Sequence, residues 1–282
     1  MRPQPKIIPR AIALACLLAA GALIAGCVST GGREKTASAL DAILAGSQRT
    51  AADRARDRYR HPKATLLFFG IRPNMRILQV WPESGWYTEI IAPLVRAKGR
   101  YFAGLIAPDP GSRFLQARRA GYLGLLASTA DVLGPVKVVN FPLDGADVLP
   151  AGSVDMVLSF RDLHTWMALG DAPEALTTIY RALAPGGVLG IVDNRGDPGV
   201  PQDPRAKSGY VRQDYAIRMI EAAGFRLVAA SEINANPKDT KNYPAGVWTL
   251  PPDYRLGNID RAKYQAIGES DRFTLKFIKP GT

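Results

Sequence analysis

The residues best suited to chemistry in this sequence lie together in one short stretch, 159–166, at the end of an apolar run. The stretch holds His164, a residue type that acts as a general base near neutral pH. Asp162 or Arg161 is placed to orient this histidine or to bind an anion, and Trp166 to stack on a ring or a cation. The stretch therefore predicts a catalytic group, with a structural histidine beside a packed tryptophan as the alternative.

A second polar pair, Asn194 and Arg195, ends a later apolar run and opens a Pro/Gly-rich loop that reaches Tyr210. This position suits contact with a substrate, and ordinary turn chemistry is the alternative explanation. No His, Cys or acidic residues have the spacing of a known metal site, so we expect no metal. The sequence also has no nucleophile elbow, no phosphate-binding GxxxxGK[ST] loop and no nucleic-acid module.

The elements that must position these residues alternate between β-type apolar runs and helical patterns. Such alternation predicts an α/β fold with a mostly parallel sheet and helices on both faces. Ligands of open α/β sheets bind outside the carboxyl ends of the strands, which is where both candidate groups lie. The predicted strands are Ile77–Val80, Tyr101–Ile106, Val136–Phe141, Val154–Phe160, Val188–Asp193, Phe225–Ile233 and Arg272–Lys279. The last of these is predicted from its strict two-residue period.

Two helical regions frame the predicted sheet. One spans 36–60 and carries a run of alternating Arg and Asp residues from Arg49 to Arg60, which predicts a solvated, salt-bridged face. The other begins after Asp171 as cap, with Glu174 at the capping-box position, and stops at residues 185–187.

A long segment over residues 234–270 is rich in Pro, Asn, Tyr and Gly. Connections of this length are uncommon unless they are functional. We therefore expect a lid or specificity insertion.

The stretch that joins the first strand to the next helix, residues 81–90, reads WPESGWYTEI. With the elements that follow, it resembles the opening motif of class I S-adenosylmethionine (SAM)-dependent methyltransferases, in particular a group of predicted bacterial methyltransferases with a WPxxGWYTEI-like stretch. The resemblance covers nearly all of the chain from about residue 48 onward. It implies a Rossmann-like methyltransferase sheet of seven strands, mostly parallel with a last antiparallel strand, and SAM as the cofactor.

The resemblance also implies which residues would hold SAM. The acid position of the motif holds Gln79, and its three alternate glycine positions hold Trp81, Glu83 and Gly85, of which only Gly85 matches. Glycine matters there because the backbone approaches the cofactor closely and glycine adopts a positive φ at little cost. Asp144, after the third strand, resembles the acid that contacts adenine, with an Asx turn as the alternative.

The first 26 residues predict a bacterial lipoprotein signal. Residues 1–10 hold three basic and no acidic residues, and the apolar run over 11–26 is shorter than the roughly 20 residues that span a bilayer. The run ends in LIAGC, which resembles a lipobox and implies cleavage before Cys27 and a palmitate-type lipid anchor on Cys27. Val28 after the cysteine favours the outer membrane, with the domain facing the periplasm. An uncleaved or simply secreted signal is the alternative.

Charge and cysteine content agree with an envelope protein. Loss of the signal lowers the formal charge from +11 to +8, which favours anionic lipid or polysaccharide over nucleic acid as a non-specific partner. Cys16 leaves with the signal, so one mature chain has no disulfide. We expect a tether over 27–35 and a single methyltransferase-like domain over 36–282; the sequence leaves the oligomeric state open.

Two functional hypotheses follow from the sequence. The first is a SAM-dependent methyltransferase-like envelope lipoprotein whose acceptor is a small molecule or an envelope component. The second is a non-catalytic ligand-binding or interaction lipoprotein with a degenerate cofactor site. Export to the envelope and the altered motif motivate the second hypothesis. The family has an acid after the second strand that accepts the ribose hydroxyls, but here residues 105–108 are apolar and the nearest carboxylate is Asp109.

Overall fold

The computed structural model describes residues 31–108 and 110–281, so the predicted signal and Cys27 lie outside the described residues. Its centre is a seven-stranded sheet in the order β3-β2-β1-β4-β5-β7-β6. Strands β1 to β5 pair in parallel, and β7 runs antiparallel to both of its neighbours. The predicted fold class is confirmed. The strands are β1 (Arg76–Val80), β2 (Arg100–Ile106), β3 (Val136–Phe141), β4 (Val154–Phe160), β5 (Leu183–Asn194), β6 (Arg226–Ser231) and β7 (Arg272–Ile278).

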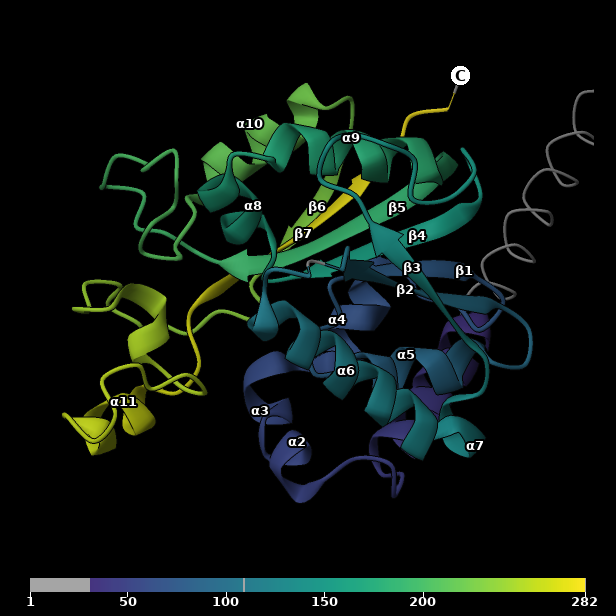
Figure 1. The fold of residues 1–282 in the computed structure, drawn as a ribbon, viewed down its shortest axis with the longest axis horizontal. Helices are drawn as coiled ribbons and strands as arrows, with labels where there is room; N and C mark the ends of the chain where they lie inside the picture. Colours follow the sequence, from purple (N-terminus) through teal and green to yellow (C-terminus); the bar gives the residue numbers. More distant parts are fainter. Residues whose placement is uncertain (1–30, 109, 282) are drawn as a thin grey trace, which may run out of the picture.

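Helices cover both faces of the sheet, as Figure 1 shows. Helices α8, α9 and α10 lie on one face, and α4, α5, α6 and α7 lie on the other with a helix over residues 31–44. The remaining elements are short helices beside these layers. The bounds are α2 (Ala51–Ala55), α3 (Asp57–Arg60), α4 (Pro62–Phe69), α5 (Thr88–Val95), α6 (Arg113–Ser128), α7 (Ala130–Leu133), α8 (Leu163–Leu169), α9 (Ala172–Ala182), α10 (Gln213–Ala222), the 3-10 helix η1 (Gly246–Thr249) and α11 (Arg261–Ile267).

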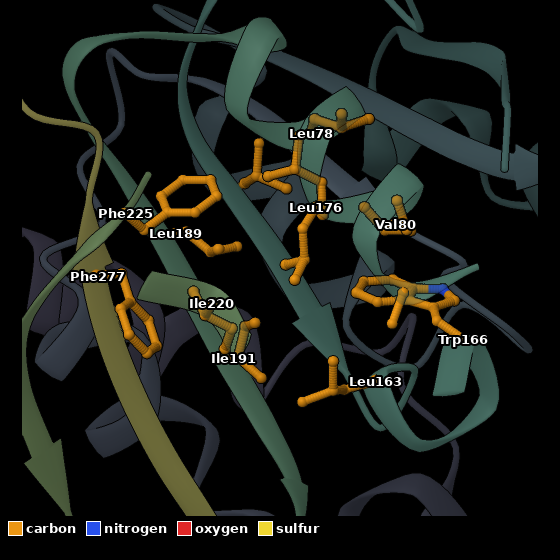
Figure 2. Packing of buried hydrophobic residues seen from close by; sticks show 14 of the residues in the cluster. Leu78, Val80, Leu163, Trp166, Leu176, Leu189, Ile191, Ile220, Phe225 and Phe277 are labelled. Atoms are coloured by element: carbon orange, nitrogen blue, oxygen red, sulfur yellow. The ribbon is translucent and has the colours of Figure 1, made fainter. Parts of the chain in front are cut away.

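Alternation along the strands separates two apolar cores. Successive strand residues point to opposite faces, so Leu78 and Val80 pack toward α8 and α9 while Ile77 packs toward α5. Figure 2 shows the first core, in which Leu176 of α9 and Ile220 of α10 meet the strand residues. The order of the strands reverses between β1 and β4, and the ends of these two strands form the place where such sheets bind ligands.

The predicted helix after Asp171 exists, but two of its details are wrong. The Asp171 side chain makes no capping hydrogen bond, so the capping box with Glu174 does not form. The helix also ends at Ala182, because Leu183 already pairs with Val154 as the start of β5. Residues 183–187 therefore belong to β5, and the helix ends before Gly186 and Gly187.

The single helix predicted over 36–60 is wrong. The tether predicted over 27–35 stays a prediction, since residues 27–30 lie outside the described residues. A helix already covers residues 31–44, and α2 and α3 follow as separate short helices. The chain breaks because Thr50 caps α2, accepting a hydrogen bond from the Asp53 N–H at 3.1 Å. It breaks again at His61, which adopts a left-handed conformation before Pro62.

The segment over 234–270 packs beside the carboxyl ends of β4 and β5, where Figure 1 shows α11 projecting away from the helical layers. It is tied to the body by Tyr210, whose hydroxyl donates to the buried Asp239 carboxylate at 3.0 Å. Within residues 31–108 and 110–281, no helix is long and apolar enough to cross a membrane.

Candidate functional site

The loop after β1 keeps the backbone shape of a glycine motif, although two of the three glycine positions hold other residues. The φ angles of Trp81, Glu83 and Gly85 are 41°, 55° and 87°, so all three alternate positions are left-handed. For residues with a Cβ this conformation costs on the order of 1–3 kcal/mol each, and such strain persists only where surrounding structure imposes it. The loop therefore has the conformation expected of a cofactor loop, while two of its side chains fill the space that glycines would leave open.

Helix α6 closes the space over this loop. Arg118 of α6 forms an ion pair with Glu83, and a Cβ on Gly85 would lie 2.1 Å from Leu125 of the same helix. The cavity that remains between Trp81, Glu83 and α6 has a volume of about 40 Å³. Pockets for drug-sized ligands have volumes of roughly 300–1,000 Å³. SAM is a ligand of that size, so the residues of this loop, as arranged, do not fit SAM.

The other positions expected to contact SAM are used by the protein itself. Gln79 is buried and accepts a hydrogen bond from the Tyr101 hydroxyl at 2.7 Å. Tyr101 also contacts Thr88 at 2.9 Å, and Thr88 contacts Tyr122 at 3.0 Å. Burial raises the pKa of Tyr101 well above its ordinary value, so the phenol stays neutral in this network. Gln79 does not line the cavity; it anchors a polar chain beneath the loop.

Asp144, expected to contact adenine, forms the Asx turn that was its alternative explanation. Its Oδ1 accepts the Ala146 N–H at 3.0 Å. Ile106, the last residue of β2, lines the small cavity, and Asp109, the nearest carboxylate after this strand, lies outside the described residues.

His164 is held by a carboxylate that sequence reasoning did not select. Its Nδ1 lies 2.8 Å from Asp193 Oδ1, and its backbone N–H donates to Asp193 Oδ2 at 3.0 Å. Asp193 is fully buried at the end of β5, and the Trp248 ring of the 234–270 segment meets the imidazole edge-on at 6.0 Å. When Nδ1 carries the proton and donates it to Asp193, the lone pair of the imidazole lies on Nε2, which is the arrangement of a general base. Asp193 also accepts the backbone N–H of His164 in the first turn of α8.

The expectation that Asp162 or Arg161 orients His164 is wrong. Asp162 turns back onto β4, where its Oδ2 accepts the Ser159 hydroxyl at 2.9 Å and the Phe160 N–H at 3.2 Å. Burial raises the pKa of Asp162 well above its ordinary value, and the charge of Asp193 adds to this. Arg161 adopts a left-handed φ of 71° and lines a separate small cavity with other arginines.

The three residues predicted to contact substrate make contacts within the protein. Trp166 is fully buried between Phe141, at a ring distance of 6.3 Å, and Trp81, at 6.0 Å. Asn194 is buried and donates from Nδ2 to the Gly209 carbonyl at 2.9 Å. Arg195 is bound by the Asp271 carboxylate through Nε at 3.1 Å and Nη2 at 2.8 Å. These contacts hold all three side chains in place, while the buried Nε1 of Trp166 has no hydrogen-bond partner among the described residues.

The run of arginines before His61, predicted to be solvated, is partly buried. Arg49 and Arg60 are only 2% and 8% exposed. Arg60 pairs with Glu269, which is distant in sequence, so no local pattern points to this contact. Across the residues that the structure describes, no group of three or more His, Cys, Asp or Glu side chains is placed to hold a metal ion.

Comparison with known proteins places the fold. No protein-family model matches the chain, and no curated protein matches it. A solved SAM-dependent methyltransferase from Aquifex aeolicus aligns with a TM-score of 0.54 at 17% identity, covering 80% of this chain and 93% of that chain. The solved [4+2]-cyclase SpnF aligns with a TM-score of 0.57 at 14% identity, covering 84% of this chain and 86% of that chain. This chain therefore has the fold of class I SAM-dependent methyltransferases.

Proposed function

We propose that this chain is a ligand-binding envelope lipoprotein that has the methyltransferase fold and does not use SAM in the loop after β1. The observation that carries this proposal is the cavity of about 40 Å³, bounded by the side chains of Trp81 and Glu83 and by α6. A fold does not fix a function, and the similarity to a protein named as a cyclase agrees with this. The envelope location rests on the lipobox-like residues that end at Cys27.

SAM-dependent methyl transfer to an unidentified acceptor is the second candidate. Two observations favour it: the left-handed backbone at the three glycine positions, and the His164–Asp193 pair at the carboxyl edge. In that case the loop around Gly85 would have to open away from Leu125, and His164 would receive a proton from the acceptor.

Titration calorimetry with SAM and with S-adenosylhomocysteine separates the two candidates. The full-length chain in detergent micelles is denatured and refolded before titration, so that any carried ligand is removed. We expect no detectable binding by the wild type. The double variant Trp81→Gly, Glu83→Gly is expected to gain affinity for SAM. It removes the two side chains that fill the loop after β1, and it relieves the backbone strain at both positions.

The control is Glu232→Gln, which neutralises an exposed acid directly after β6 and should leave SAM binding unchanged. Micromolar binding by the wild type would overturn the first candidate and support the second. The envelope anchor has its own test: Cys27→Ala should release the protein from the membrane fraction, and unchanged membrane association would contradict lipidation at Cys27.

A further inference from the structure

The edge of the sheet opposite the candidate site is rich in basic side chains. Parallel pairing brings the starts of β1, β2 and β3 together, with Arg76 opposite Arg100 and Phe102 opposite Lys137. Strand β7 runs antiparallel to β5 and therefore ends at the same edge. We call six residues at these strand ends and in the adjoining segments the basic edge: Arg33, Arg72, Lys98, Arg100, Lys137 and Lys276.

Two hollows open on the surface between these cations. Arg72 and Lys276 line one, which has a volume of about 360 Å³. Arg100 and Lys137 line the other, which has a volume of about 420 Å³. Among the described residues that line the two hollows, Asp155 is the single carboxylate, and Arg76 binds it at 2.7 Å. Both hollows therefore present positive charge to solvent.

The cations of the basic edge have no carboxylate of their own. In the part of the chain that the structure describes, none of the six forms an ion pair; five are exposed and Lys276 is half-buried. Burial lowers the pKa of Lys276, and the positive charges of Arg33 and Arg72 add to this effect, so these three cations lie close enough to repel one another. A hydrogen bond from Arg76 lowers the pKa of Asp155, to which Arg72 also contributes. One carboxylate is thus shared by several cations.

The described chain begins at this edge. Residue 31 opens the first described helix, and Arg33 in its first turn donates to a carbonyl in the last turn of α4 at 3.2 Å. Helix α4 ends at the basic edge because the next element, β1, starts there. Glu34 and Lys35, in the same first turn, offset each other in charge. Cys27 precedes residue 31 by four residues, which span at most about 14 Å when extended. A lipid on Cys27 therefore keeps the basic edge near the bilayer.

We propose that the basic edge lies against the anionic headgroups of a phospholipid bilayer. The inference rests on the lipoprotein part of the function proposed above, because the anchor makes lipid phosphates the anions nearest to this edge. Each Lys or Arg near an anionic bilayer strengthens the contact by about fivefold, and an anchored domain meets the surface at a high effective concentration. In this orientation the carboxyl edge, with the His164–Asp193 pair, faces away from the bilayer toward soluble ligands.

Lysine footprinting on vesicles tests this orientation. The full-length chain is reconstituted into phosphatidylcholine vesicles with and without phosphatidylglycerol, its lysines are acetylated with a membrane-impermeant N-hydroxysuccinimide ester, and the rate at each lysine is read by mass spectrometry. Lys98 and Lys137 should react about threefold or more slowly on vesicles with phosphatidylglycerol. High salt should abolish the difference, because it screens exposed charges. Lys207 and Lys263, which are exposed beside the carboxyl edge, are internal controls and should react at equal rates on both kinds of vesicle.

Two double variants show whether the basic edge causes the protection. Arg72→Gln, Arg100→Gln should abolish most of the protection of Lys137, since the loss of two cations weakens the contact by more than about tenfold. Arg205→Gln, Arg218→Gln makes the same charge change at exposed positions away from the basic edge, and it should keep the wild-type protection. Equal protection in both variants would overturn the proposal.

Other outcomes separate this proposal from the anchor and from a different partner. A chain that floats with phosphatidylcholine vesicles but gives Lys98 and Lys137 equal rates on both kinds of vesicle is anchored without this orientation, which overturns the proposal alone. A chain that does not float with phosphatidylcholine vesicles contradicts the lipid anchor, and the proposal fails with it. Protection of the same lysines by dissolved heparin but not by phosphatidylglycerol would overturn the assignment to a bilayer in favour of a polysaccharide.

Discussion

The substitution Glu269→Gln should destabilise this protein more than any other single charge change. Glu269 is 2% exposed and is the carboxylate shared by Arg56, Arg60 and Arg272. Glutamine preserves the shape of the side chain and part of its hydrogen bonding. It removes the negative charge, so that the three bound guanidinium groups and Arg161 face one another without compensation.

The magnitude follows from the cost of leaving buried charges unpaired. Breaking a buried ion pair by removing one partner costs about 3–5 kcal/mol. For a domain of this size each kcal/mol lowers the melting temperature by about 2–4 °C, so we expect a decrease of roughly 6–20 °C. The lowered pKa of Glu269 sets the pH dependence. Its stabilisation is complete above the unfolded-state pKa, about 4.3, and is lost as the pH falls toward the folded-state pKa.

Differential scanning calorimetry at neutral pH and below pH of about 4 measures both effects. The difference between wild type and variant should be largest at neutral pH and should shrink on acidification. Glu232→Gln is the matched control, because Glu232 pairs with Arg195 while its side chain is 66% exposed, and such pairs contribute about 0–1 kcal/mol. Equal losses for the two variants at neutral pH would refute the reasoning that Glu269 holds a buried cationic cluster together.

Three further predictions concern the rest of the carboxyl edge. Asp193→Ala should lower the free energy of unfolding in urea by more than His164→Ala does, because Asp193 accepts hydrogen bonds from the backbone and ring of His164 and from the next backbone N–H; equal losses would argue against this capping role. Gly85→Ala should cost about 1–3 kcal/mol in the same urea assay, since φ is 87° and the new Cβ would overlap α6, whereas Gly121→Ala in the open middle of α6 should be neutral or stabilising. Glu89 is 5% exposed and burial raises its pKa to about 7, so the folded state retains a proton that the unfolded state loses. The free energy of unfolding should therefore fall by about 1–2 kcal/mol as the pH rises from 5 to 8. Thermal unfolding of Glu89→Gln should lack this decrease.

Local pattern in the sequence was sufficient for the strands, whereas the seven-stranded methyltransferase sheet was implied by the resemblance. The strands β3 and β4 have the predicted bounds, and the others differ by a few residues at their ends. Apolar runs of β-branched residues and the two-residue period of β7 are local properties, since they depend on which faces a strand buries.

The site depended on contacts that no local pattern encodes. His164 and Asp193 are 29 residues apart, and Arg60 and Glu269 are 209 residues apart, so the carboxylate that each side chain meets is chosen by the order of the strands. A charged run such as that around Arg60 looks the same in sequence whether it faces water or a buried partner.

The sequence by itself determined the strands, their order along the chain and the altered glycine positions. Only the tertiary structure decided that α6 closes the loop at Trp81 and Glu83, and that three distant segments bring their arginines to one cavity. The physical reason is that backbone conformation and amphipathic pattern act over a few residues, whereas the environment of a charge depends on every segment packed around it.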